Sequence, residues 1–324
     1  MSNPRPTVLL AGKVHPRVRE RVEAEFEAIS IENGDSSLLD ADARARIRGV
    51  AAATAISAEF IDSLPNLEVI ANFGVGYDAV DAAHAASRGV MVTNTPDVLS
   101  DEVADTTVGL LLNTVRELPK AEAYLRDGKW ESQGAYPLTS LSLRGRTVGI
   151  FGLGRIGLAI ARRLEAFGLG IHYHTRNKRT DVDYLWHARL IDLAGAVDTL
   201  VVVVPGGAAT EKAVNAEILD ALGPQGVLIS VGRGSTIDEP ALIAALQEKR
   251  IAAAGLDVFA HEPHVPQELM DLPNACLLPH VASASVLTRN AMADLVVDNL
   301  EAWLEGRPAL TPVPECAGLD RASS

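Results

Sequence analysis

Cysteine and long apolar runs are both scarce in this sequence. Only two cysteines, Cys276 and Cys316, occur in 324 residues, so the chain has neither the framework of a disulfide-rich secreted domain nor a zinc-binding pattern. No apolar run approaches the roughly 18 residues that a membrane-spanning helix needs. The start of the chain also lacks the apolar segment of a secretory signal. We therefore expect a soluble, cytoplasmic protein that holds no metal.

Positive charge is the second scarcity. The chain has 29 lysine and arginine residues against 42 aspartate and glutamate residues, which gives a formal net charge of −13. Such a surface repels nucleic acid and anionic membranes, so we expect neither as a partner. The composition is otherwise that of a globular protein, with 48% hydrophobic and 22% charged residues, and the length suits about two domains.

Short β-branched runs alternate with amphipathic stretches along the chain, which is typical of βαβ units around parallel sheets. In the first hundred residues the pattern predicts strands at 7–11, 52–56, 67–72 and 90–93. A second unit is predicted to contain six strands, at 147–151, 170–174, 199–204, 226–231, 255–258 and 275–278. Six short strands separated by helices suit a doubly wound sheet.

A glycine-rich turn follows the strand predicted at 147–151. It reads Gly152, Leu153, Gly154, Arg155, Ile156, Gly157 and opens a predicted helix. In a dinucleotide-binding fold the first glycine permits the tight turn and the second lets backbone amides approach a pyrophosphate. The third lets the helix pack on the strand, and the helix N-terminus adds a positive field. A ligand-free turn and a methyltransferase loop are the alternatives.

The next strand, at 170–174, ends in a basic segment. An NAD site usually has an acidic side chain here for the ribose 2′-hydroxyl, but Arg176, Asn177, Lys178 and Arg179 come before the first acid, Asp181. Arg176 can pair with a 2′-phosphate, assisted by Lys178 or Arg179. The segment therefore predicts a preference for NADPH, with NADH possible. A merely solvated basic loop is the alternative.

Three polar residues follow predicted strands of the second unit: Arg233, Glu262 and His280. Ligands bind at the carboxyl ends of strands in a doubly wound sheet, so we expect these residues to converge. Each has an ordinary explanation alone, as an exposed arginine, a surface glutamate or a histidine in a turn. Together they suggest a substrate binder, an orienting carboxylate and a proton donor.

These blocks carry a family resemblance. The glycine loop, residues 229–234, residues 254–259 with Glu262 and Pro263, and Pro279 with His280 closely resemble the D-isomer-specific 2-hydroxyacid dehydrogenases. The similarity runs from about Asn72 to Val313. Residues 220–226, 238–240 and 292–297 look most like the branch that reduces hydroxypyruvate, hydroxyphenylpyruvate and glyoxylate.

The resemblance implies roles for individual residues. Arg233 would hold the substrate carboxylate, His280 would donate a proton to the carbonyl oxygen, and Glu262 would hydrogen-bond the imidazole and favour its protonated form. The backbone amides of Val75 and Gly76 would also bind the carboxylate. The implied cofactor-binding residues are Gly152, Leu153, Gly154, Arg155, Ile156, Gly157, Thr175, Arg176, Asn177, Arg179, Val204, Pro205, Thr210, Val231, Gly232, Asp257 and Ser283.

The resemblance also implies an architecture. Residues 101–286 would form a Rossmann NADP-binding domain inserted into a flavodoxin-like substrate domain made of residues 1–100 and 287–324. The turn-rich loop from Asp127 to Ser142, with Trp130, Tyr136 and Leu138, would join two copies into a homodimer. A lid packed on its own subunit is the alternative for this loop.

The expected activity is the NADPH-dependent reduction of small 2-oxo acids, such as glyoxylate, hydroxypyruvate or arylpyruvates, to D-2-hydroxy acids. Two alternatives remain from the sequence. One is a nucleotide-sensing, corepressor-like binding protein, because a fold does not fix a function. The other is a formate-type NAD dehydrogenase.

Overall fold

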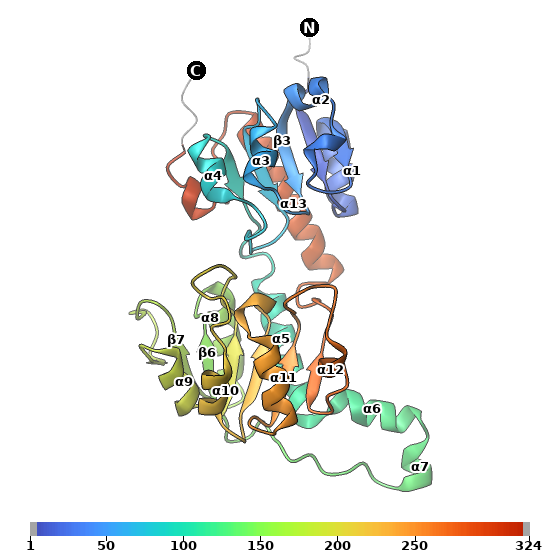
Figure 1. Ribbon diagram of the computed structural model, residues 1–324, viewed down its shortest axis with the longest axis vertical. Helices are drawn as coiled ribbons and strands as arrows, with labels where there is room; N and C mark the ends of the chain where they lie inside the picture. Colours follow the sequence, from blue (N-terminus) through green and yellow to red (C-terminus); the bar gives the residue numbers. More distant parts are fainter. Residues whose placement is uncertain (1–4, 320–324) are drawn as a thin grey trace. The chain divides into compact units, whose positions relative to one another are not determined.

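The computed structural model describes residues 5–319 and divides into two compact units (Figure 1). The first unit comprises the chain up to Leu99 and from Ser285 onward, and the second comprises Ser100–Ala284. Each unit is built on one parallel β-sheet with helices on both faces. The predicted class, two α/β units with parallel sheets, is confirmed.

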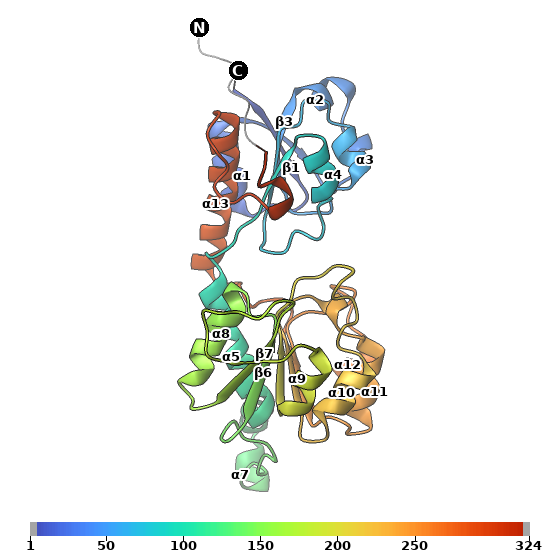
Figure 2. The same ribbon diagram turned by 90° about the vertical axis from the view of Figure 1, so that its left-hand side faces the viewer.

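The first unit has a five-stranded sheet in the order β2-β1-β3-β4-β5. Its strands are β1 (Thr7–Ala11), β2 (Glu27–Ile31), β3 (Ile47–Ala52), β4 (Val69–Asn72) and β5 (Met91–Thr93). Helices α1 (Pro16–Glu25) and α13 (Val286–Leu304) cover one face, while α2 (Ala41–Arg46), α3 (Ala58–Asp62) and α4 (Ala82–Ser87) lie on the other (Figure 2). Two 3-10 helices, Ser36–Leu38 and Pro314–Cys316, complete the unit. This strand order is that of flavodoxin-like folds.

Burial explains why these segments form the sheet. Every residue of β1 is buried, as expected for a strand covered by helices on both faces. The long helix α13 adds apolar side chains to the same core, among them Val296, Val297, Leu300 and Trp303. The short helices on the other face begin at side-chain caps, and Asp40, for example, accepts a hydrogen bond from the amide of Ala43 at 2.7 Å.

One sequence prediction in this unit was wrong, and one strand was missed. The strand expected at 52–56 is β3, at Ile47–Ala52, and β2 was not predicted. β3 pairs along the whole length of β1, with Gly49 beside Val8 and Ala52 beside Ala11, so the neighbouring strand fixes its position. Arg48 and Gly49 interrupt the apolar pattern that would have marked this strand. β2 lies at an edge and is largely solvent-exposed, so its sequence carries little hydrophobic signal.

The second unit has a seven-stranded sheet in the order β12-β11-β10-β9-β6-β7-β8. Its strands are β6 (Thr147–Phe151), β7 (Gly170–His174), β8 (Leu185–Trp186), β9 (Thr199–Val202), β10 (Val227–Ser230), β11 (Ala253–Leu256) and β12 (Ala275–Leu277). Helices α5 (Ser100–Arg116) and α8 (Arg155–Glu165) cover one face, and α9 (Leu190–Ala196), α10 (Ala216–Leu222) and α11 (Glu239–Gln247) cover the other (Figure 2). The short helix α12 (Gln267–Met270) and a 3-10 helix at Gly234–Thr236 lie in connections.

The order of these strands identifies where a ligand would bind. The chain starts the sheet at β6, adds β7 and β8 on one side, and then returns to add β9 to β12 on the other. The direction of strand addition therefore reverses between β6 and β9. In open α/β sheets the crevice outside the carboxyl ends of the strands at this reversal is the usual ligand site.

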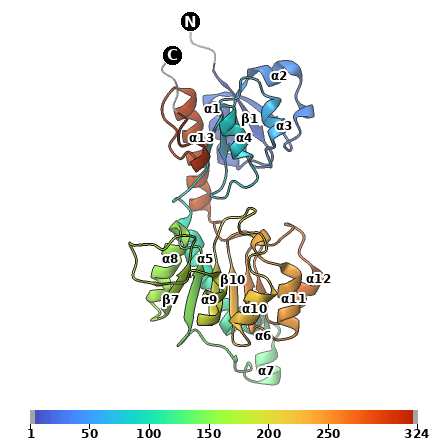
Figure 3. The same cartoon turned by 60° about the vertical axis from the view of Figure 1, so that its left-hand side comes forward.

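One segment stands apart from the core of the second unit. Helices α6 (Leu118–Arg126) and α7 (Lys129–Gln133), with the following loop to residue 142, form an arm that projects from the unit (Figure 3). Neither helix of the arm has a buried residue. The side chains of Trp130 and Leu138 are 63% and 100% exposed. Among the described residues, no helix is long and apolar enough to cross a membrane.

Candidate active site

The glycine-rich loop between β6 and α8 has the geometry of a phosphate cradle. Gly152 has a φ of +102°, which side chains rarely tolerate. A Cβ atom on Gly157 would lie 2.1 Å from the carbonyl oxygen of Gly152, so this glycine allows the helix to pack on the turn. Gly154 faces open space, and no side chain caps α8. Exposed amides at a helix N-terminus beside an open Cα fit a pyrophosphate.

The basic segment after β7 divides into two parts with different contacts. The side chains of Arg176 and Lys178 are exposed, and within residues 5–319 neither forms a hydrogen bond or ion pair. Arg179 instead donates to the carbonyl oxygen of Leu153 at 2.7 Å and pairs with Asp181. Its charge is therefore neutralised, and its side chain ties the basic segment to the glycine loop. Arg176 and Lys178 remain available to an anionic ligand.

The loops after β9 and β10 contact each other beside the glycine loop. A Cβ on Gly152 would meet Val204, and one on Gly232 would lie 2.6 Å from the carbonyl oxygen of Val204. Within the loop after β9, the hydroxyl of Thr210 donates to the carbonyl oxygen of Pro205 at 2.6 Å. The residues expected to line the cofactor thus lie at one edge of the sheet. Asn177 is exposed, and Thr175 donates a hydrogen bond to its carbonyl oxygen at 2.7 Å.

His280 and Glu262 form a hydrogen-bonded pair. Nδ1 of His280 lies 2.6 Å from Oε2 of Glu262, and Oε1 of Glu262 accepts the amide of Phe259 at 3.0 Å. Burial opposes ionisation of Glu262, but the hydrogen bonds from His280 and Phe259 and nearby positive charge outweigh it, so the pKa of Glu262 lies below its usual value. Nε2 of His280 has no partner within the described chain. It is the nitrogen left to face a ligand.

Asp257 holds the turn that carries His280. Its carboxylate is completely buried and accepts the amides of Val281 at 2.7 Å and Ala282 at 2.9 Å. Its carbonyl oxygen accepts the amide of His280 at 2.9 Å. His280 itself has a φ of +52°, a conformation that non-glycine residues seldom adopt without such support. Burial raises the pKa of Asp257 despite the two backbone hydrogen bonds.

This contact was not predicted from the sequence. Asp257 was expected to bind the cofactor, and in the structure its carboxylate also accepts the amides of Val281 and Ala282, beside His280. The only sequence signal was an acid placed inside an apolar run, from residue 253 to 259, where a charged side chain needs a buried partner. Ser283 directly follows Val281 and Ala282, whose amides Asp257 accepts, and it is half-buried.

Arg233 lies at the same edge of the sheet, at the end of the loop that follows β10. Its guanidinium donates to the carbonyl oxygen of Gly232 at 2.9 Å, and its charge is among those that lower the pKa of Glu262. Gly234 brings the two loops together, because a Cβ there would lie 1.9 Å from backbone atoms of Phe259. The structure therefore brings Arg233, Glu262 and His280 together, as their positions after neighbouring strands predicted.

In the first unit, the loop after β4 exposes the backbone amides of Val75 and Gly76, which we call the amide hook. The side chain of Asn72 donates to the carbonyl oxygens of Gly74 at 3.2 Å and Gly76 at 3.0 Å, and Asn94 donates to that of Val75 at 2.8 Å. The amides of Val75 and Gly76 donate no hydrogen bond within the described residues. The side chains of Asn72 and Asn94 thus bind the carbonyl oxygens of this loop, and the two backbone N–H groups remain available to an anion. Asn72 and Asn94 were not predicted as supports of this loop.

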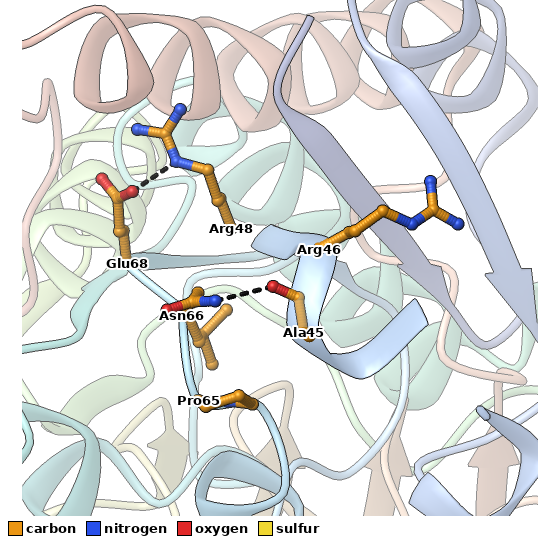
Figure 4. A pocket seen from close by; sticks show the side chains of 7 residues that line it. Ala45, Arg46, Arg48, Pro65, Asn66 and Glu68 are labelled. Carbon is orange, nitrogen blue, oxygen red and sulfur yellow. Dashed lines mark hydrogen bonds and ion pairs between the residues drawn. The ribbon is translucent and has the colours of Figure 1, made fainter. Parts of the chain in front are cut away.

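A surface hollow in the first unit is separate from these residues (Figure 4). It lies where β3 and β4 begin, at the opposite end of the strands from the amide hook. Its charged groups are already paired, because Arg48 binds Glu68 and Arg46 binds Glu27 and Asp42. No group of three or more histidine, cysteine or acidic side chains in the described chain could hold a metal ion.

Comparisons with known proteins identify the family of this chain. Residues 108–282 match the family described as D-isomer specific 2-hydroxyacid dehydrogenase, NAD binding domain. The chain is 49% identical over 309 residues to glyoxylate/hydroxypyruvate reductase A of Arabidopsis thaliana, covering 94% of this chain and 98% of the relative. It is 50% identical over 256 residues to hydroxyphenylpyruvate reductase of Plectranthus scutellarioides, covering 79% and 81%.

A solved structure is closer in sequence. An NADPH-dependent glyoxylate/hydroxypyruvate reductase from Sinorhizobium meliloti, determined with NADP and malonate, is 60% identical. The TM-score is 0.94, and the match covers 96% of this chain and 98% of the other.

The glycine loop makes a prediction about stability. Gly157→Ala should lower the free energy of unfolding by about 2 kcal/mol, because the clash with Gly152 outweighs the better helix propensity of alanine. Gly154→Ala is the matched control, since nothing lies within 4 Å of its Cβ position, and should change stability by less than about 0.5 kcal/mol. Urea unfolding of both variants tests this. Equal losses would contradict the assigned packing.

Proposed function

The chain belongs to the D-isomer-specific 2-hydroxyacid dehydrogenases, and we propose that it reduces glyoxylate to glycolate, and hydroxypyruvate to the D-2-hydroxy acid, with NADPH. Family membership makes it an oxidoreductase. The observation that carries the proposal is the His280–Glu262 pair, which leaves Nε2 of His280 open beside Arg233 at the carboxyl edge of the second sheet. A 2-oxo acid presents the two groups that such residues recognise, a carboxylate and a carbonyl oxygen.

Arg233 in the second unit and the amide hook in the first each present donors suited to a carboxylate. A planar guanidinium can donate two parallel hydrogen bonds to a carboxylate, and the hydrogen bond from Arg233 to Gly232 fixes the side chain. The free amides of Val75 and Gly76 supply the same type of donor from a rigid backbone. Binding by such preset donors costs little reorganisation when the substrate arrives.

His280 acts as the proton donor in this proposal. Glu262 accepts from Nδ1, which leaves the protonated Nε2 to donate to the substrate carbonyl oxygen as negative charge develops there. Glu262 stays ionised at neutral pH and stabilises the imidazolium. When bound, NADPH supplies the hydride for the carbonyl carbon. A proton donor held in this way has no use in formate oxidation, which protonates no carbonyl oxygen.

The cofactor is bound by the glycine loop and by Arg176. Gly152, Gly154 and Gly157 would admit the pyrophosphate to the N-terminus of α8. Arg176, with no internal partner, would pair with the 2′-phosphate, and Lys178 would add charge. No acid stands where an NAD-specific site has one, so NADH would bind more weakly. Arg179 holds the loop and does not contact the phosphate.

A substrate panel tests the activity itself. We expect NADPH oxidation, followed by its absorbance, with glyoxylate and hydroxypyruvate. Measured kcat/KM values would rank these substrates against arylpyruvates and would detect any formate activity in the reverse direction. A corepressor-like binding protein would instead bind NADPH without turnover of any 2-oxo acid, which would contradict the proposal.

The proton donor gives a prediction about turnover. His280→Ala should lower kcat by roughly 10²–10⁴-fold without weakening NADPH binding. Glu262→Gln should also lower kcat, but by less than His280→Ala, because the imidazole remains and loses only its carboxylate partner. The measurements are kcat for glyoxylate and the Kd for NADPH. An unchanged kcat in Glu262→Gln would remove Glu262 from this function.

The basic segment gives a cofactor prediction. Arg176→Gln should lower kcat/KM for NADPH by about 10- to 100-fold, because a charge-assisted hydrogen bond is lost, and leave that for NADH nearly unchanged. Calorimetry with 2′,5′-ADP and 5′-AMP reads the same contact without turnover. Arg162→Gln, an exposed arginine on α8, is the control for net charge. A parallel loss with both cofactors would contradict a 2′-phosphate contact.

We also propose that the arm, residues 118–142, joins two copies in a homodimer. Its apolar side chains are exposed at Leu118, Leu125, Trp130 and Leu138, whereas Tyr136 packs on Tyr124 and donates to Glu117. The arm is therefore held to its own chain by Tyr136, and its exposed apolar side chains are available to a second copy. Sedimentation should give a dimer that the pair Trp130→Ser and Leu138→Ser dissociates. Leu185→Ser, exposed elsewhere in the same unit, is the control.

A further inference from the structure

Three side chains form a stack at the carboxyl edge of the first sheet, which we call the Phe73 stack. His15 follows β1, Phe73 follows β4 directly, and Arg289 lies in the first turn of α13. The rings of His15 and Phe73 are 5.8 Å apart and nearly parallel, with an interplanar angle of 10°. The guanidinium carbon of Arg289 lies 5.8 Å from the centre of the Phe73 ring. All three side chains are half-buried.

Arg289 supplies the positive charge of this stack. Burial lowers the pKa of His15, and the charges of Arg289 and Arg17 lower it further, so the imidazole is neutral at pH 7. The guanidinium keeps its charge at every physiological pH. A half-buried cation over an aromatic face can donate hydrogen bonds that are stronger than those at a fully exposed surface.

The position of the stack relates it to the substrate. Phe73 is two residues before Val75, whose free amide belongs to the hook for the substrate carboxylate. In a 2-oxo acid, C3 is only two bonds from the carboxylate carbon, so a group that recognises a C3 substituent must lie close to the partners of the carboxylate. Phe73 is near the amide of Val75 along the chain, and Arg289 places a hydrogen-bond donor over the Phe73 ring.

We propose that Arg289 selects 2-oxo acids that carry a hydrogen-bond-accepting oxygen on C3, as hydroxypyruvate does, over those with a methyl group, as in pyruvate. The inference rests on the proposed function. The hydroxyl of hydroxypyruvate accepts a hydrogen bond from the guanidinium. The methyl group of pyruvate cannot accept one, so pyruvate gains no hydrogen bond from Arg289. Glyoxylate has no C3 and does not reach the stack.

Glyoxylate therefore serves as an internal control in the test. We would measure kcat/KM for hydroxypyruvate, pyruvate and glyoxylate at saturating NADPH in the wild type, Arg289→Met and Arg289→Lys. Arg289→Met should lower kcat/KM for hydroxypyruvate by about 10- to 100-fold, mainly through KM, and leave glyoxylate and pyruvate nearly unchanged. Arg289→Lys should keep part of the preference because it keeps the charge. Arg307→Met, an exposed arginine of the same unit, should change nothing.

Two results would overturn the inference. One is an equal loss with glyoxylate and hydroxypyruvate, which would make Arg289 a general carboxylate binder or a structural residue. The other is an unchanged preference for hydroxypyruvate in Arg289→Met. If Arg289→Met does not fold, Arg289→Lys decides, because loss of the planar fork must still lower the ratio of hydroxypyruvate to glyoxylate efficiency. Failure of the proposed function is distinct, since wild-type protein would then turn over none of the three substrates.

Discussion

The buried carboxylate of Asp257 is the contact on which the geometry of the His280 turn in the second unit depends. It accepts two successive amides, those of Val281 and Ala282, and thereby holds His280 in a left-handed conformation that its own side chain disfavours. Burying a carboxylate is costly unless hydrogen bonds compensate, and here the compensation comes from the turn that must be fixed. The imidazole can then meet Glu262, which is itself anchored by the amide of Phe259. Backbone hydrogen bonds thus position Asp257, His280 and Glu262 before a substrate binds.

The same use of backbone recurs elsewhere in the molecule. In the first unit the side-chain amides of Asn72 and Asn94 donate to carbonyl oxygens of the loop. The backbone N–H groups of Val75 and Gly76 remain open. In the second, Arg179 binds the carbonyl of Leu153 and ties the basic segment to the glycine loop. The net charge of −13 is therefore a poor guide to the ligands. Short-range donors at strand ends outweigh a surface field that salt screens.

The sequence predicted best what is decided locally. The strand β6, the glycine loop and α8 lie where the turn chemistry placed them, and the positions of Arg233, Glu262 and His280 after strands predicted that they would meet. Features decided by distant partners were missed. The position of β3 follows from pairing with β1, and the use of Asp257 follows from amides 24 and 25 residues later in the chain. Arg179 was expected to assist a 2′-phosphate, and the sequence did not show that its side chain pairs with Asp181.

We expect Asp257 to position His280 through the amides of Val281 and Ala282. The direct measurement is kcat for glyoxylate reduction in Asp257→Asn together with the Kd for NADPH from cofactor fluorescence. The substitution turns one acceptor into a donor that faces a backbone N–H, so the His280 turn must shift. If Asp257 positions His280, kcat falls roughly 10²-fold, while the Kd for NADPH barely changes. A weakened Kd with kcat preserved would contradict this expectation.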